Sequence, residues 1–220
     1  MKDEEPTGEE QVANSPRERL LELVVTVLLA AAALLSAWCA YQSARYSSRE
    51  NVGHAAATRL HVAATRADNQ AGRLEQIDTI AFFEWVDATA AGDPARATFL
   101  RDRFRDEMQP AFAAWIDMDP LTNPDAPGTP FELAEYRVAK ADEATAFELT
   151  AAVAALTGDE AGSTADQFLL AVVLYALALF QLGIQSRIGV FELRLALVTL
   201  AGAITVGTTI WVTTVALRGG

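Results

Sequence analysis

Three long apolar stretches without a charged residue constrain the fold of this 220-residue chain more than any other feature of its sequence. They cover residues 23–44, 167–186 and 195–217. A helix of about 20 apolar residues suffices to cross the ~30 Å hydrocarbon core of a bilayer. The sequence therefore predicts an all-α membrane protein with three transmembrane helices, one near the N-terminus and two in a C-terminal hairpin.

The residues around these stretches set the expected domain boundaries. The first fifteen residues are rich in Glu and poor in apolar side chains, so we expect a disordered acidic tail. Between the first and second spans, we expect a helical soluble domain of three to four helices, including a long helix that continues from span 1. The predicted segments are the tail 1–15, transmembrane helix 1 at 16–44, the soluble domain 45–164, transmembrane helix 2 at 165–187, a short turn 188–194 and transmembrane helix 3 at 195–217.

Local start and stop signals predict the helices of the soluble part. The capping box at 15–18 opens a helix with no further proline until Gly92-Asp93-Pro94 ends it. Asp93-Pro94 starts the next helix, which Pro110 should kink or split after Met108. Residues 119–130 form a proline-rich loop. A second capping box at 129–132 predicts a helix to about residue 156, which Gly158 should end, and a third at 163–166 should open the second span.

Aromatic and aliphatic residues at helical spacing predict the core of the soluble domain. Steps of three and four residues place them on one face of the helix after Gly92, against an aromatic patch at the end of the long helix. The patch is Phe82, Phe83, Trp85 and Val86, and the facing residues are Phe99, Leu100, Phe104, Met108, Phe112, Trp115 and Ile116.

The long helix carries an alanine-rich apolar stripe with charged residues on both sides. The stripe consists of Leu60, Ala63, Ala64, Ala67, Ala71, Leu74, Ile77 and Ala81. One flank carries Arg59, Arg66 and Arg73, and the other carries His54, His61, Asp68 and Glu75. An apolar seam with charged flanks is typical of packed helices. The seam could lie within the domain or between subunits, and the flanks are candidate interaction residues.

The loop from Thr122 to Pro130 is the second candidate interaction feature, with Asn123 and Asp125 as candidate interaction residues. Loops this rich in proline act as spacers or as recognition surfaces.

Several classes of function lack sequence support. The formal net charge of −12 argues against nucleic-acid binding, which needs clustered Lys and Arg. No phosphate loop, nucleophile elbow or zinc motif is present, so we expect no enzyme, cofactor, metal or identifiable small-molecule substrate. No ionisable residue lies at mid-depth of a span, where ion-coupled carriers need one, so we expect no ion-coupled transporter. His54 and His61 are too far apart on one helix to share a metal ion unless symmetry-related subunits bring copies together.

The expected location is the cell (inner) membrane, as a multi-pass protein. The number of basic residues near the spans is balanced between the two sides of the membrane. Charges in long loops influence insertion little, so the basic residues of the soluble domain count for less than those beside the N-terminus and the 188–194 turn. We therefore expect a cytoplasmic N-terminus and 188–194 turn, with the soluble domain outside the cytoplasm.

Several sequence segments resemble those of a family of uncharacterised bacterial three-span inner-membrane proteins, over the whole region from Pro16 to Leu217. The matching segments are Ala37–Gln42, Ile77-Asp78, Phe83–Asp87, Arg103–Glu107, Leu121–Pro127 and the C-terminal hairpin. The resemblance implies a bacterial envelope protein and no activity. Together these features favour a non-catalytic structural or interaction component, in contact with the lipid bilayer and with a protein partner or further copies of itself. The alternative is an oligomeric channel or transport-associated subunit whose Thr205 and Thr209 line a water-filled lumen.

Overall fold

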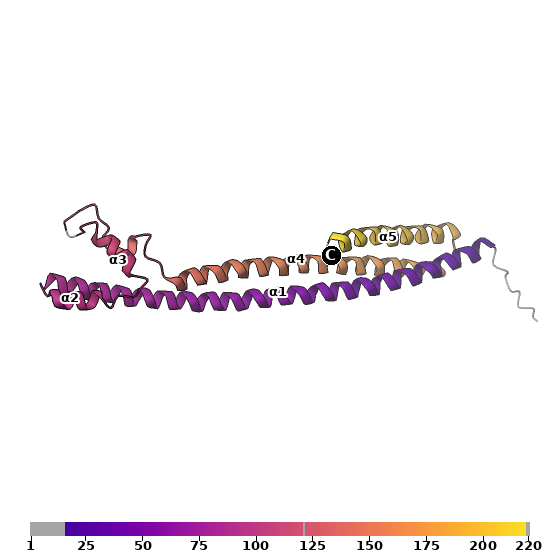
Figure 1. Ribbon diagram of the computed structural model, residues 1–220. Helices are drawn as coiled ribbons and strands as arrows, with labels where there is room; N and C mark the ends of the chain where they lie inside the picture. The colour runs from indigo at the N-terminus through magenta and orange to yellow at the C-terminus, as the bar shows by residue number, and fades with distance from the viewer. Residues whose placement is uncertain (1–15, 121, 219–220) are drawn as a thin grey trace, which may run out of the picture. The chain divides into compact units, whose positions relative to one another are not determined.

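The computed structural model describes residues 16–120 and 122–218, so the predicted tail lies outside the described residues. All of the regular structure in the described residues is helical, which confirms the all-α prediction. Three of the helices are long and apolar enough to cross a membrane, as predicted. The helices are α1 (Pro16–Ala90), α2 (Pro94–Arg101), α3 (Gln109–Ile116), α4 (Ala139–Ile184) and α5 (Phe191–Arg218), with short 3₁₀ turns η1 (Pro130–Glu132) and η2 (Gln185–Arg187) (Figure 1).

The chain forms two compact units. The first unit combines the N-terminal part of α1, up to Asn51, with the chain from Gly158 onward. The second unit is the continuous segment Val52–Thr157, which contains the rest of α1, the two short helices α2 and α3, and the first part of α4.

The first unit is a bundle of the three apolar helices (Figure 1). Leu21 and Val25 of α1 pack with Leu182 of α4 and with residues of α5 in one buried cluster. A second cluster further along α1 includes Cys39, which is fully buried. All three helices contribute to both clusters, so each helix packs against the other two.

Aromatic residues mark the end of the bundle where α1 becomes charged again after its apolar stretch. The ring of Phe168 on α4 stacks on Tyr46 at 5.7 Å and meets Trp38 edge-on at the same distance. Nearby, a Cβ atom on Gly162 would lie 2.7 Å from the carboxylate carbon of Glu50. The absence of a side chain at Gly162 therefore lets α1 and α4 approach closely here.

In the second unit, α1 and α4 pack through alanines. Ala57, Ala64 and Ala71 of α1 are buried at intervals of seven residues, and so are Ala144 and Ala151 of α4. Figure 1 shows the two helices side by side. Small side chains at every second turn allow close packing, and the seven-residue interval keeps the small residues on the contact face. The alanine seam is therefore buried within a single chain, the first of the two possibilities that the sequence left open.

An aromatic cluster closes the second unit at the end of α1. Phe82 and Trp85 of α1 pack edge-on against Trp115, with ring centroids 5.3 and 6.3 Å away. Phe104, Met108 and Phe112 complete the buried cluster, as the helical spacing predicted. The prediction of a buried core position is wrong for two residues, because Phe83 and Phe99 are both 54 % exposed. The Arg103 guanidinium lies over the Phe99 ring, 3.4 Å from the ring centroid, so a cation–π contact stabilises this ring outside the core.

The predicted break at Pro110 is confirmed, although the first helix ends earlier than expected. Helix α2 stops at Arg101 and α3 begins at Gln109, with Pro110 in its first turn. Residues 102–108 form turns. Gly92, with φ of 68°, ends α1 in the left-handed conformation that glycine adopts easily.

The predicted break around Gly158 is wrong, because α4 runs without interruption from Ala139 to Ile184. Gly158 is buried, and it continues the seven-residue interval of Ala144 and Ala151. A small residue at this position serves packing, which outweighs the cost of about 1 kcal/mol for a glycine inside a helix. The capping box at Ser163 is likewise inside the helix rather than at its start.

The capping box at 129–132 forms, but it opens a 3₁₀ turn rather than a long helix. The Glu132 carboxylate accepts hydrogen bonds from the Thr129 amide and hydroxyl, both at 3.2 Å. The chain then becomes extended at Leu133, and α4 begins only at Ala139. Phe131, Leu133 and Tyr136 pack on the aromatic cluster, so tertiary packing determines this segment.

Candidate functional site

The three arginines of the predicted flank lie on the outer surface of α1 in the second unit. Arg59, Arg66 and Arg73 are exposed, and none of them makes an ion pair with another residue in the described part of the chain. Val62, 45 % exposed, lies between them on the same helix face. This row of arginines is therefore available to an external partner.

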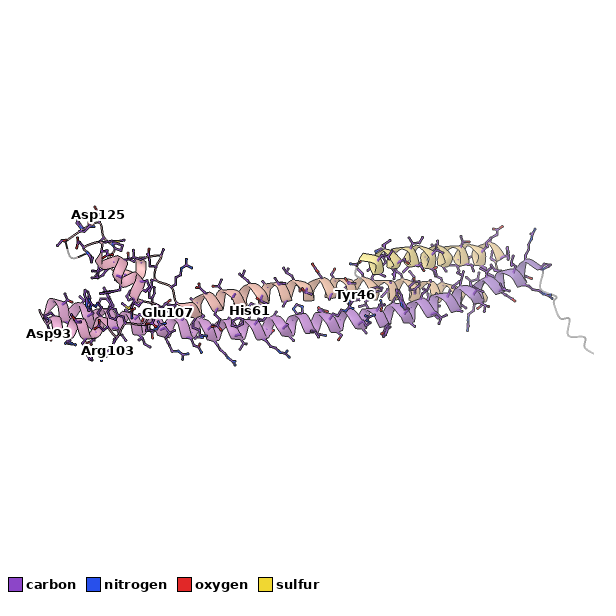
Figure 2. All side chains as sticks on the ribbon, viewed as in Figure 1. Tyr46, His61, Asp93, Arg103, Glu107 and Asp125 are labelled. Atoms are coloured by element: carbon purple, nitrogen blue, oxygen red, sulfur yellow. The ribbon has the colours of Figure 1, made fainter. Side chains whose placement is uncertain are left out.

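The opposite flank is exposed as well, and one of its members is used within the chain. His61 Nδ1 lies 2.7 Å from a Glu148 carboxylate oxygen of α4, across the alanine seam (Figure 2). His54, Asp68 and Glu75 also have exposed side chains. Within the described residues, no group of three His, Cys, Asp or Glu side chains is arranged to hold a metal ion.

The two predicted loop residues have different roles. The Asn123 side chain binds the loop itself: its carbonyl accepts from the Asp125 amide at 3.0 Å, and its amide donates to the Met118 carbonyl at 3.1 Å. The Trp115 indole also donates to the Pro127 carbonyl at 2.7 Å, which anchors the loop to the aromatic cluster. Asn123 therefore shapes the loop, whereas Asp125 is exposed on it (Figure 2).

An apolar ridge is exposed on α4. Leu149, Val153 and Leu156 are 67, 64 and 62 % exposed and lie at steps of four and three residues, on one side of the helix. Asp142 lies on the same side one helical repeat earlier and is exposed. We call these three apolar residues the α4 ridge.

A buried ionic cluster connects α1 to the segments that follow α2 and precede α4. The Asp78 side chain is 1 % exposed and accepts hydrogen bonds from Arg105 Nη1 at 2.8 Å and from the Tyr136 hydroxyl at 3.0 Å. Arg105 also pairs with Glu107, whose other oxygen accepts from the Ala139 amide at the start of α4. This cluster fixes the position of both segments relative to α1.

Burial raises the pKa of Asp78 above its usual range, although the Tyr136 hydroxyl and the Arg105 charge act in the opposite direction. Burial, and then the Asp78 charge, raise the pKa of Tyr136 as well. The tyrosine therefore remains a hydrogen-bond donor to the carboxylate at neutral pH.

The raised pKa of Asp78 predicts a pH dependence of stability. The folded protein binds the Asp78 proton more tightly than the unfolded chain does. The stabilisation that comes from protonated Asp78 is therefore fully present below the unfolded pKa of 3.8, and it is lost as the pH rises through the pKa of the folded protein. The free energy of unfolding of wild type, minus that of Asp78→Asn, should therefore decrease from pH 3.8 upward. Denaturant unfolding of both proteins between pH 3.8 and about pH 7 measures this difference, and a difference that increases with pH would contradict the prediction.

A groove of about 940 Å³ lies between the end of α1, α2 and α3. Trp85, Phe104 and Phe112 of the aromatic cluster lie along its base, and Ile116 extends the apolar lining. An ion pair of 2.6 Å between Arg96 of α2 and Glu84 of α1 holds one wall in place.

The rim of the groove is mainly acidic. Three aspartates from separate turns of the chain line it: Asp93, which Figure 2 labels, Asp102 and Asp117. The one basic lining residue is Arg101, whose guanidinium lies 3.4 Å from the Asp102 carboxylate. The carboxyl ends of α1 and α3 also border the groove, and helix carboxyl ends carry partial negative charge.

Some polar groups in the apolar helices lie between helices of the first unit, whereas Thr199, Thr213 and Thr214 are exposed. Thr205 and Thr208 are buried, and the Thr209 hydroxyl lies 2.9 Å from that of Tyr175. Near the turn, Arg194 donates to the Gln185 side chain at 3.2 Å. These placements show threonines that contribute to packing between helices.

Sequence reasoning missed the ionic cluster, the groove and the α4 ridge. One signal was present for the cluster: Asp78 follows Ala57, Ala64 and Ala71 at the seven-residue interval, so a carboxylate occupies a seam position. No comparable local signal marks the groove, because its lining residues come from segments that only the fold brings together.

The chain matches no family model, and neither a curated protein nor a solved structure is significantly similar to it.

Proposed function

We propose that this protein is a non-catalytic integral membrane protein of the bacterial cell envelope, in which three helices anchor a unit that binds protein. Its first binding partner is a further copy of the same chain. The observation that carries the proposal is the exposed α4 ridge, which no residue in the described part of the chain covers.

The position of the ridge favours protein over lipid as its partner. The charged residues Asp159, Glu160 and Asp166 separate the ridge from the uncharged part of α4. The α1 segment that faces this part of α4 carries the His61 pair and the exposed arginines. Charged groups on both helices oppose insertion into hydrocarbon, so an apolar surface here is best covered by another protein.

Charge complementarity favours a second copy. The second unit contains seventeen acidic and nine basic residues, and the exposed α4 surface around the ridge includes Asp142. The arginine row with Val62 on α1 has the opposite charge and a matching apolar component. In the proposed assembly, the arginine row of one copy packs against the α4 ridge of the next copy.

In this proposal, the bundle of the first unit lies in the bilayer, and the second unit lies outside it as a helical domain. The N-terminus and the turn between α4 and α5 lie on the cytoplasmic side, with the second unit on the other side. The inward-facing threonines of α5 support a packed anchor rather than a channel lumen.

The arginine row provides the test of this proposal. The variant Arg59→Glu/Arg66→Glu/Arg73→Glu should shift the protein from oligomer to monomer, because like charges would face Asp142 and the acidic surface of the adjacent copy. Native mass spectrometry of protein released from its own membrane with minimal detergent measures the subunit number.

The matched control replaces the same three arginines by lysine, which keeps the charge and should keep the oligomer. Replacing Leu149, Val153 and Leu156 by Gln tests the other side of the proposed contact and should also give monomers. An unchanged oligomer in both the Glu and the Gln variants, or a wild-type protein that is monomeric, would overturn self-association.

A further inference from the structure

We propose that the groove between the end of α1, α2 and α3 binds a segment of a partner protein that inserts apolar side chains and carries lysine or arginine on both sides of them. The proposal deepens the interaction role proposed above, but it does not depend on self-association, because the groove and the arginine row are separate surfaces of the second unit.

The base of the groove determines the apolar part of the ligand. Its aromatic side chains belong to the cluster that closes the second unit, and their positions are fixed by mutual edge-on packing, with ring centroids of Trp85 and Phe112 at 4.8 Å. A preformed apolar base binds an inserted side chain without first ordering the protein. The volume of about 940 Å³ exceeds what one side chain needs, so more than one can enter.

The rim determines the charged part of the ligand. Asp93 caps the N-terminus of α2 by accepting from the Arg96 amide at 3.0 Å, so its carboxylate is held in position. Asp102 and Asp117 are exposed at the ends of α2 and α3. Three carboxylates and only one arginine give the rim a negative charge, which complements a cationic ligand.

The distribution of these carboxylates favours a peptide segment over a small cation. The three residues come from different turns of the chain: Asp93 precedes α2, Asp102 follows α2 and Asp117 follows α3. A ligand that contacts more than one of them must carry separated positive charges, with its apolar side chains between them. A protein segment with basic residues on both sides of an apolar pair has this arrangement.

The binding experiment uses the full chain in nanodiscs of zwitterionic lipid and an acetylated, amidated probe peptide, Lys-Leu-Ser-Leu-Lys. Isothermal titration calorimetry measures binding, with empty nanodiscs as the blank. Two matched peptides, Gln-Leu-Ser-Leu-Gln and Lys-Ser-Ser-Ser-Lys, remove the charges and the apolar side chains separately, and each should bind at least about tenfold more weakly.

Two protein variants locate the site. Ala113→Trp fills the groove from an exposed position of α3, and Asp102→Lys/Asp117→Lys reverses two rim charges; each should weaken binding about tenfold or more. Ala134→Trp, at an exposed position outside the groove lining, is the control for the added indole. Near-UV circular dichroism checks that each variant keeps its aromatic packing.

The outcomes separate this proposal from the proposed self-association. Arg59→Glu/Arg66→Glu/Arg73→Glu should bind the probe peptide as wild type does, whatever its subunit number. The proposal is overturned if no probe binds, if the Gln peptide binds as well as the Lys peptide, or if neither groove variant weakens binding. Equal binding of hexylammonium and the Lys peptide would also overturn it, in favour of a small amphiphilic cation.

Discussion

Replacing Asp78 by alanine is expected to destabilise the second unit by about 3 kcal/mol, because the substitution removes a buried carboxylate that accepts from two donors and leaves the partly buried Arg105 guanidinium with Glu107 as its one remaining carboxylate partner. Arg105 and the Tyr136 hydroxyl both donate to Asp78, and the Arg105–Glu107 pair lies beside the start of α4. Limited trypsin digestion of the protein in nanodiscs measures the effect. Cleavage after Arg101, Arg103 and Arg105 should become much faster when this region opens.

Asp87→Ala is the matched control for this prediction, since Asp87 is an exposed aspartate on the same helix. The double variant Asp78→Leu/Arg105→Met removes the guanidinium charge together with the carboxylate and fills the space with apolar side chains, so it should be less destabilised than Asp78→Ala alone, even though Tyr136 and Glu107 each lose one partner. Digestion of Asp78→Ala at the same rate as Asp87→Ala would show that the ionic cluster does not hold this region together.

Replacing Trp115 by alanine is the second large effect and should also destabilise the second unit by about 3–5 kcal/mol. The indole is 4 % exposed and packs against Phe82, Trp85 and Phe112, so its removal leaves a cavity in the centre of the cluster. Its hydrogen bond to the Pro127 carbonyl is lost too, which frees the loop. Denaturant unfolding, monitored by near-UV circular dichroism, measures the change in the free energy of unfolding.

Trp115→Phe separates the two contributions, because it keeps a ring in the cluster and removes the hydrogen bond. The cost of the lost bond should be about 0.5–1.5 kcal/mol, in addition to a smaller packing loss. Phe83→Ala, at a 54 % exposed position of the same patch, is the control and should have little effect. Equal losses for Trp115→Ala and Phe83→Ala would mean that the cluster is not the core of the second unit.

Features that depend on a few neighbouring residues could be predicted from the sequence. The apolar length of the spans, the helix end at Gly92 and the break near Pro110 all follow from rules that act within one or two helical turns. The alanine-rich apolar stripe with its charged flanks also indicated that α1 packs closely on another helix.

Features that depend on distant residues could not be predicted in this way. The partners of Asp78 are 27 and 58 residues away in sequence, and no local pattern pairs them. The same limitation explains the errors at Gly158 and Phe99. Burial of a glycine in a helix contact and the cover of a ring by Arg103 both depend on what surrounds the residue in the folded chain.

The alanine seam has a consequence for the dynamics of the second unit. An alanine methyl group removes little apolar surface from water, so each turn of the seam gains less free energy of burial than a turn packed through leucine. The aromatic cluster, in contrast, concentrates large buried rings at one end. Cooperative opening should therefore begin along the alanine-lined turns of α1 and α4, where amide protons exchange first, while the region around Trp115 remains closed longest.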